Sequence, residues 1–442
     1  MSTAAYLFDL IDDAKARLSG AEVVLGTLAS EESDFVRFNR ARVRQAMTIR
    51  QSYLSLTLVD GKRQDSVTLS LSGVYGEDRE RVRGALDRVR ASLPAMPEDP
   101  YLLYSTEPEH TERIETSRLP APEEALEVIL DAASGTDFVG VFAAGPVRRA
   151  FASSLGHRHQ HEVSSYQLDF SLYHAADKAA KGSLAAFDWN PSAVRKAIAD
   201  TEAELGHLTR PAKTIDVGAH RAYLAPSAVA ELVAMLSWGG VSEKAQRTKT
   251  SSLQRLVSGE ATLSEKISLR ENVAAGLAPA FDEVGFSKPG VVGLIEGGKH
   301  SGSMVSARTG VEYGIDANGA SPDEELTSAD LAAGTLDEAD VLASLDTGVY
   351  VKNLWYLGFS DRPSARVTGM TRFATLWVER GRIVAPLNVM RFDDSLYRML
   401  GDNLLDLTAS RAFKVSPNTY GGRSVETARV PGALLGELLF TL

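Results

Sequence analysis

The chain contains no cysteine among its 442 residues. It therefore cannot form a disulfide bond, use a thiolate as a nucleophile, or hold zinc or an iron–sulfur cluster through cysteine ligands. Long apolar runs are also missing. The longest uncharged ones, residues 138–147 and 232–241, fall far short of the roughly 20 residues that a membrane-spanning helix needs. We expect no contact with a membrane.

Basic residues are fewer than acidic residues. The 47 lysines and arginines are outnumbered by 58 aspartates and glutamates, which gives a formal net charge of -11. Binding to a phosphate backbone depends on clustered basic side chains, so nucleic acid is excluded as a partner. The first 18 residues include Asp9, Asp12 and Asp13 and lack the basic start and apolar core of a secretory signal. We therefore expect a cytoplasmic protein.

The apolar residues recur with two different periods, which predicts an α+β fold. A helical period covers residues 4–18, 77–93, 122–134, 190–205 and 226–238. Alternation or short apolar runs predict strands over residues 54–58, 67–71, 138–144, 165–172, 348–359 and 372–390. Asp60-Gly61 is a turn signal that joins the first two strands into a hairpin. The N-terminal half should be an α/β region, and the rest should be rich in strands.

A chain of this length exceeds one ordinary hydrophobic core, so two or three domains are expected. Residues 94–122 hold six prolines and no sustained period, which is typical of a linker or an irregular connection between units. We predict an N-terminal α/β domain over 1–100, a central α/β domain over 110–210, and a β-rich C-terminal domain over 211–442. The acidic stretch 321–340 is predicted to be an exposed insert or loop.

Motifs for several catalytic mechanisms are absent. Neither His-Glu-x-x-His nor His-Glu-x-x-x-His occurs, and the helix predicted over 226–238 contains Glu231 but no histidine. The nucleophile elbow Gly-x-Ser-x-Gly and the phosphate-binding glycine patterns are also missing. Glu231 is then best interpreted as a solvated or paired helix carboxylate, and no catalytic residue is assigned.

Three of the eight histidines lie close together, at positions 157, 159 and 161. In an extended segment, His157, His159 and His161 would share one face and could bind a first-row metal. In a helix only the first and third would align. The competing interpretation, which we favour, is an exposed polar turn whose histidines titrate near neutral pH.

Aromatic residues gather in the strand predicted over 348–359. Tyr350, Trp355 and Tyr356 combine a large apolar area with a polar tip, so they are candidates for binding a peptide substrate. The competing interpretation is that they fill the core of a sheet, as aromatic residues in strands usually do.

A series of sequence blocks in the C-terminal half carries a family resemblance. The blocks, in order, are Ala222-Tyr-Leu-Ala-Pro-Ser-Ala-Val-Ala-Glu-Leu, Leu263-Ser-Glu-Lys-Ile-Ser-Leu, Phe281-Asp-Glu-Val-Gly, Leu294-Ile-Glu-Gly-Gly, Gly348-Val-Tyr-Val-Lys-Asn-Leu-Trp-Tyr, Val367-Thr-Gly-Met-Thr-Arg-Phe, Val378-Glu-Arg-Gly-Arg-Ile-Val-Ala-Pro-Leu and Arg391-Phe-Asp-Asp-Ser-Leu. Their order and spacing resemble the TldD/PmbA family of metallopeptidases. Val36-Arg-Phe-Asn and Ala152-Ser-Ser-Leu-Gly fit the same pattern, so the resemblance covers most of the chain.

The resemblance implies an N-terminal α/β region and a β-rich C-terminal domain of the TldD/PmbA type. In that family, TldD-type members carry His-Glu-x-x-x-His and bind zinc on the helix that corresponds to residues 226–238 here. Members of the PmbA type (also called TldE) lack the motif and pair with a TldD-type subunit. This chain resembles the PmbA type, because it has Ala228-Val-Ala-Glu-Leu-Val-Ala there.

The resemblance then implies a non-catalytic subunit of a heterodimeric zinc metallopeptidase that acts on small or unfolded peptides. Zinc is expected in the TldD-type partner and not in this chain. Two alternatives stay open. The chain could be an autonomous metallohydrolase that uses His157, His159 and His161, or an assembly protein with the same fold and no role in proteolysis.

Overall fold

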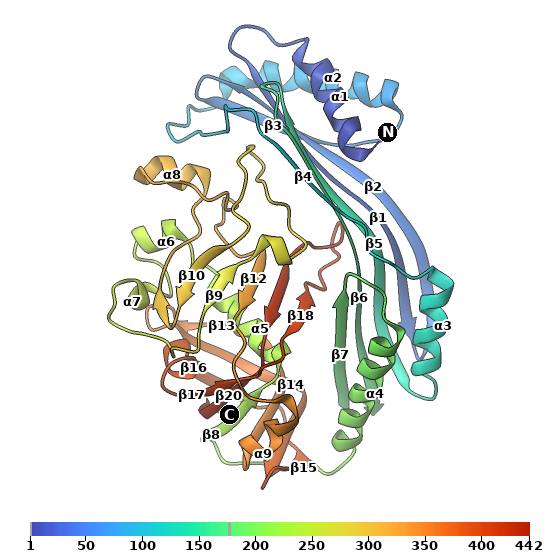
Figure 1. The fold of residues 1–442 in the computed structure, drawn as a ribbon, viewed down its shortest axis with the longest axis vertical. Coiled ribbons are helices and arrows are strands. Elements are labelled where there is room, and N and C mark those ends of the chain that lie inside the picture. Colours follow the sequence, from blue (N-terminus) through green and yellow to red (C-terminus); the bar gives the residue numbers. More distant parts are fainter. Residues whose placement is uncertain (1, 176–177) are drawn as a thin grey trace.

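A long curved β-sheet forms one side of the molecule, and two further sheets with their helices form the other (Figure 1). The structure is a computed structural model that describes residues 2–175 and 178–442. The mixture of helices and strands confirms the predicted α+β class, with an N-terminal α/β region and a β-rich C-terminal part.

The first sheet has the strand order β3-β2-β1-β5-β6-β4, with β7 also paired to β6. Its strands are β1 (Val23–Asn39), β2 (Arg42–Asp60), β3 (Arg63–Ser70), β4 (His110–Glu115), β5 (Asp137–Ser153), β6 (Arg158–Ala175) and β7 (Lys178–Ala186). The pairing of β4 with β6 is parallel and the other pairings are antiparallel. In the centre of the sheet β1 pairs with β5, so that Leu25 lies opposite Ser153.

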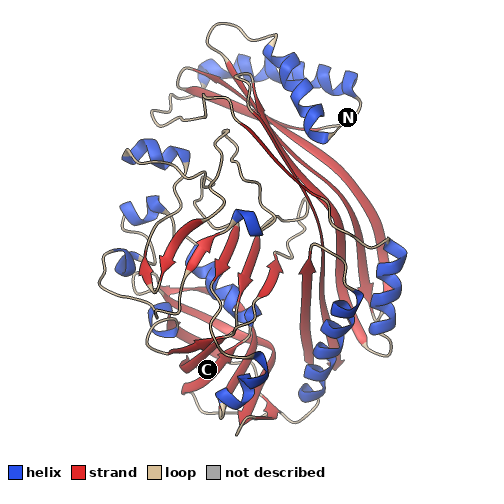
Figure 2. Ribbon diagram, viewed as in Figure 1, coloured by secondary structure: helices blue, strands red, loops and turns tan. Residues whose placement is uncertain are grey.

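Two helices cover each end of this sheet, as Figure 2 shows. At one end lie α1 (Thr3–Lys15) and α2 (Tyr75–Ser92), whose apolar faces share a core with β1 and β2. At the other end lie α3 (Pro122–Ala132) and α4 (Pro191–Leu208), packed against β5 and β6. The Asn190 side chain accepts a hydrogen bond from the Ala193 N–H and so begins α4.

The C-terminal half contains two sheets. One has the order β11-β10-β9-β12-β19-β18, and the other β13-β8-β20-β16-β14-β15 with β17 paired to β20. The strands are β8 (Gly218–Leu224), β9 (Leu269–Glu271), β10 (Val292–Glu296), β11 (Lys299–His300), β12 (Ser328–Leu331), β13 (Gly348–Asp361), β14 (Arg366–Glu379), β15 (Arg382–Pro386), β16 (Arg391–Ser395), β17 (Leu404–Leu407), β18 (Ala412–Val415), β19 (Thr427–Val430) and β20 (Ala433–Phe440).

The helix α5 (Pro226–Ser237) packs between these two sheets. Pro226 at its first position has no N–H to leave unpaired, which favours a helix start there. Its apolar side chains Ala228, Val229, Leu232 and Leu236 belong to the largest hydrophobic core of the chain. The shorter helices of this half are α6 (Glu243–Arg247), α7 (Gln254–Val257), α8 (Ala307–Tyr313), α9 (Val341–Leu345) and α10 (Leu396–Met399).

Two stretches differ from the sequence prediction. The proline-rich stretch 94–122 was predicted to have no regular structure, but it contains β4, which pairs with β6. The acidic stretch 321–340 was predicted to be an exposed insert or loop, but it contains the largely buried β12 between β9 and β19. In both stretches a strand of six or fewer residues is held by its neighbours in the sheet, and so short a strand carries little periodicity of its own.

The long sheet extends across the domain boundary that we predicted near residue 110. Strands β1 to β3 come from residues 1–100, and β4 to β7 come from residues 110–210. These two regions therefore contribute to one sheet. None of the helices that the structure describes combines the length and the apolar character needed to cross a bilayer.

Candidate functional site

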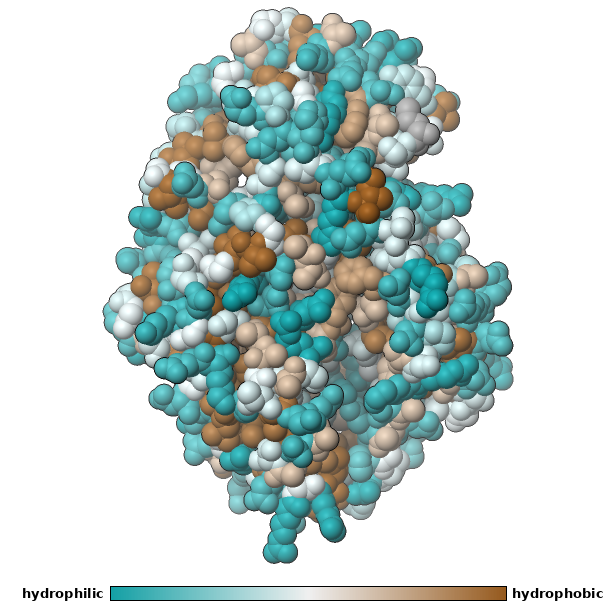
Figure 3. Space-filling view, viewed as in Figure 1, coloured by the Kyte–Doolittle hydropathy of each residue, from teal (hydrophilic) through white to brown (hydrophobic). Residues whose placement is uncertain are grey.

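A cleft of about 360 Å³ lies where the two halves of the molecule meet. Its walls are α5, the strands β18 and β19 with residues of the chain between them, and residues of β6, β7, β12 and β13. The face of the molecule in Figure 3 is mostly hydrophilic and is hollowed between the two halves. This cleft is the candidate functional site, because pockets of this size with a few convergent polar groups are where small ligands bind.

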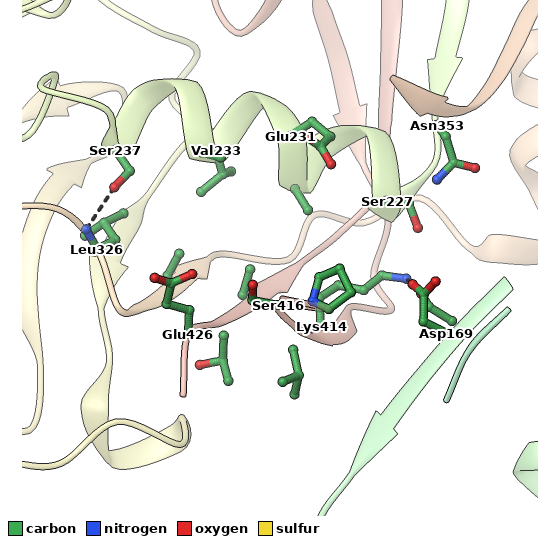
Figure 4. A pocket seen from close by; sticks show the side chains of 18 of the residues that line it. Asp169, Ser227, Glu231, Val233, Ser237, Leu326, Asn353, Lys414, Ser416 and Glu426 are labelled. Atoms are coloured by element: carbon green, nitrogen blue, oxygen red, sulfur yellow. Dashed lines mark hydrogen bonds between the residues drawn. The ribbon is translucent and has the colours of Figure 1, made fainter. Parts of the chain in front are cut away.

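One face of α5 runs along the cleft. Ser227, Ala230, Glu231, Ala234 and Ser237 all line it, as their helical spacing requires. The opposite face of the helix is buried in the core, as described above. Figure 4 shows Ser227 at one end of the cleft and Ser237 at the other, with Glu231 between them. The helix therefore presents a mainly small and polar surface to any ligand.

The single carboxylate on this face of α5 is Glu231. Its side chain is open to the cleft, but the surrounding walls remove part of its hydration. This desolvation raises the pKa of Glu231, and the positive charge of Lys181 offsets the rise in part. Glu231 is thus a carboxyl group that favours its protonated form more than an ordinary glutamate does.

Three lysines gather near the Ser227 end of the cleft, and two of them are paired with a carboxylate. Lys181 lies 3.1 Å from Asp169, and Lys352 lies 2.5 Å from Glu204. Lys414, in β18, donates a 2.8 Å hydrogen bond to the Ser183 hydroxyl. Within the part of the chain that the structure describes, no carboxylate forms an ion pair with Lys414.

Burial lowers the pKa of Lys414 to about 8, with a further contribution from the charge of Lys352. A cation that is removed from water and left without a counter-ion is expected to behave in this way. The Ser227 end of the cleft therefore carries one positive charge that the protein itself does not neutralise.

The opposite end of the cleft is acidic. Glu325 and Glu426 are exposed at its mouth. Desolvation raises the pKa of Glu325, and the negative charges of Asp323 and Glu426 add to the rise. The cleft thus has a negative end near Ser237 and a positive end near Ser227.

The three aromatic residues predicted to bind substrate do not line this cleft. Tyr350 packs on Tyr223 with ring centroids 5.3 Å apart, which fits the core interpretation for that residue. Trp355 is half exposed beneath the Arg372 guanidinium, and Tyr356 is 83% exposed. Asn353, on the same strand, does line the cleft. A role of Tyr350, Trp355 and Tyr356 in substrate binding stays a prediction.

His157 immediately precedes β6, His159 and His161 lie within it, and all three side chains are buried. The favoured interpretation as an exposed turn is therefore wrong, because β6 is covered on this face by residues from the other half of the chain. The ring centroids of His157 and His159 are 6.0 Å apart. His157 bonds to the hydroxyls of Ser153 and Ser105 at 2.7 and 2.9 Å.

The other two rings reach across to the C-terminal half. His159 bonds to the Thr111 hydroxyl at 2.8 Å and to the Gly285 carbonyl at 3.2 Å, and His161 bonds to the Leu277 carbonyl at 2.9 Å. Across residues 2–175 and 178–442, no three His, Asp or Glu side chains are grouped closely enough to hold a metal ion together.

A zinc ion of the type bound by the helical metallopeptidases does not fit α5. Such a site needs at least three nitrogen, sulfur or carboxylate ligands that converge on one point. Glu231 is the one metal-ligating side chain that α5 presents to the cleft, and the nearby Asp169 is paired with Lys181. The donor set at this helix is therefore suited to binding polar groups of a ligand and not to holding zinc.

Sequence reasoning missed Lys414, Lys181 and Asp169 as cleft residues. They lie far apart in the sequence and meet because β18 lies against β7. The sequence could have indicated Lys414, because it lies between Phe413 and Val415 in a short apolar segment. A lysine within such a segment needs either a counter-ion or a route to water.

Comparison with known proteins agrees with this architecture. The PmbA/TldA metallopeptidase C-terminal domain matches residues 218–438, which is half of the chain. The chain belongs to the TldD/PmbA family, which confirms the resemblance seen in the sequence blocks. No curated protein matches the chain by sequence.

Solved structures show the same fold over the whole chain. TldE from Thermococcus kodakarensis is 14% identical and has a TM-score of 0.79, covering 99% of this chain and 100% of its own. A proposed modulator of a DNA gyrase from Thermotoga maritima is 13% identical with a TM-score of 0.77, and both chains are covered completely. A proposed modulator of DNA gyrase from Bacteroides thetaiotaomicron is 14% identical with a TM-score of 0.75, covering 99% of this chain and 98% of its own.

Proposed function

We propose that this chain is the non-catalytic subunit of a two-subunit, cytoplasmic metallopeptidase of the TldD/PmbA type that acts on small or unfolded peptides. A TldD-type partner with the His-Glu-x-x-x-His helix would bind zinc and activate the water molecule. This chain would contribute contacts to the peptide and help to enclose it.

The observation that carries this proposal is the composition of α5. The corresponding helix of TldD-type members carries the zinc ligands, but here its cleft face offers serine, alanine and Glu231. In this chain the helix packs between the two sheets and lines the cleft. A helix that lines the cleft without a set of metal ligands supports a role in binding and assembly.

The proposal is tested by purifying the chain and a candidate TldD-type partner from the same genome. Zinc content and cleavage of short peptides are then measured for each chain alone and for the mixture. We expect no stoichiometric zinc and no cleavage by this chain alone, and cleavage by the mixture that exceeds the activity of the partner alone. A partner in which the glutamate of His-Glu-x-x-x-His is replaced by glutamine is the control, and its mixture should be inactive.

Other outcomes would favour the alternatives. Stoichiometric zinc in the isolated chain that is lost on substitution of His157, His159 and His161 would show an autonomous metallohydrolase. A stable complex with the partner but no change in cleavage would show an assembly protein. The hydrogen bonds that each of the three rings makes within the protein do not favour the first of these outcomes.

A further inference from the structure

The cleft along α5 separates charge along its length, and this separation matches the two ends of a short peptide. Figure 4 shows the Lys414 ammonium directed toward the end where Ser227, Asn353 and Asp169 lie. Glu426 lies at the other end, near Ser237. A peptide with free ends carries one positive and one negative charge separated by its own length.

The Ser227 end has two independent sources of positive potential. The first is Lys414, which has a hydroxyl and no carboxylate as its partner. The second is the N-terminus of α5, a helix of 12 residues whose N-cap residue, Ala225, provides no capping side chain. The partial positive charge of a helix N-terminus favours an anion, and the negative charges of Glu325 and Glu426 at the other end favour a cation.

The neighbouring charges leave this preference in place. Lys181 is paired with Asp169 and Lys352 with Glu204, so these four groups contribute little net charge. Asp169 and Glu204 favour the charged form of Lys414, and Lys352 and Lys181 oppose it. Glu231 also lines this region, and desolvation raises its pKa, so its charged form is less favoured than that of an ordinary glutamate. Lys414 is thus the group left to be neutralised by a ligand.

The dimensions limit the ligand to a few residues. From Ser227 to Ser237 the helix rises about 15 Å, at about 1.5 Å per residue. An extended peptide advances about 3.3 Å per residue, so about four residues span that length. Small side chains such as Ala230, Ala234 and Ala428 line the cleft between its ends and leave room for an extended chain.

We propose that this cleft binds the C-terminal end of a short peptide, with its α-carboxylate on Lys414 and its preceding residues directed along α5 toward Glu325 and Glu426. This inference rests on the proposed function, which makes peptides the ligands of this chain. It adds that the non-catalytic subunit recognises the end of the peptide through a charge of its own.

The test is calorimetric binding of tetra-alanine to the 442-residue chain, measured without partner or zinc. Tetra-alanine amide, which lacks the terminal carboxylate, should bind about tenfold or more weakly, because a charge-assisted hydrogen bond is lost. The Lys414→Met variant should lose affinity for the free acid to a similar extent and should no longer distinguish acid from amide. The matched control is Lys299→Met, an exposed lysine on β11, which should bind both peptides as the unaltered chain does.

Three results would overturn the proposal: no binding of tetra-alanine, equal binding of acid and amide, or unchanged discrimination in Lys414→Met. Displacement of the peptide by acetate at the same concentration would also overturn it, because the site would then be a general anion site. These measurements are independent of the activity test. If the isolated chain selects the free acid but the mixture cleaves nothing new, the proposed subunit role fails and the peptide site stands.

Discussion

Lys414 on β18 donates a hydrogen bond of 2.8 Å to Ser183 on β7, although 231 residues separate them in the sequence. This bond joins the edge of a C-terminal sheet to the long N-terminal sheet. The candidate cleft therefore exists only when both halves of the chain are folded and in contact.

Replacing Lys414 with methionine is expected to stabilise the fold by about 1 kcal/mol at neutral pH, because it removes a half-buried cation that has no counter-ion. The midpoint of urea unfolding measures the change. Lys299→Met, at an exposed position, should shift the midpoint by no more than about 0.5 kcal/mol. A Lys414→Met variant less stable than the unaltered chain would show that the ammonium has a favourable partner.

The stability difference between these two chains should depend on pH. The pKa of Lys414 is lowered from 10.5 to about 8 in the folded state, so between these values the unfolded chain binds more protons than the folded one. The contribution of Lys414 to the free energy of unfolding therefore rises as the pH increases from about 8 to 10.5. The difference in unfolding free energy between Lys414→Met and the unaltered chain should be largest below pH 8 and should disappear toward pH 10.5. Unfolding midpoints measured at pH 7, 9 and 10 would show this change.

His159→Ala is expected to destabilise the fold by about 2 to 4 kcal/mol. The variant loses hydrogen bonds to Thr111 and Gly285 and the stacking of the ring on Phe281, whose centroid is 5.2 Å away. Thermal unfolding measures this loss, and the exposed His110→Ala is the control. If His159→Ala had the same melting temperature as the unaltered chain but lost a bound metal, the ring would have a metal-binding role in place of the structural one.

Tyr356→Gly separates a substrate-binding role from a structural one. Tyr356 is 83% exposed and has a φ of 58°, a conformation that glycine adopts without strain. We expect the stability to stay within about 1 kcal/mol of the unaltered chain. Peptide cleavage by the two-chain assembly should fall if this residue contacts substrate, and Tyr420→Gly, at a 99% exposed position, is the control. Unchanged cleavage would contradict the predicted role of Tyr356.

Gly145→Ala is expected to prevent stable folding or to cost several kcal/mol. Gly145 has a φ of 145°, and an added Cβ would lie 2.0 Å from the backbone oxygen of Glu32. Strands β1 and β5 would have to separate there. The control is Gly206→Ala in α4, where a Cβ meets nothing within 4 Å and a gain of up to about 1 kcal/mol is expected. A normal melting temperature for Gly145→Ala would contradict the packing described here.

The sequence predicted the long elements well, because each carries its own period. The helix predicted over 226–238 is α5, and the alternation of Tyr166, Leu168, Phe170 and Leu172 marks the buried face of β6. The hairpin with Asp60-Gly61 at its turn is β2 and β3. In these segments the local pattern and the tertiary contacts require the same structure.

The cleft was not predictable in the same way. Its charged residues come from segments between 169 and 426, and none of these segments has a motif of its own. The burial of the histidine cluster was also not predictable from the local sequence. Its polarity favoured an exposed turn, but the partners of His161 and His159 come from residues 277 and 285, which no local pattern relates to them.

The central pairing of β1 with β5 also sets an order of events during synthesis. The Val24 N–H donates to the Ser154 hydroxyl, and 130 residues separate the two. At about 5 to 20 residues per second, the ribosome delivers the partner of β1 roughly 7 to 26 seconds after β1 itself. During this interval the hairpin of β1 and β2 has one unpaired edge, which is open to mispairing or to a chaperone. The edge of β1 thus stays unpaired for longer than it would in a protein whose neighbouring strands follow one another in sequence.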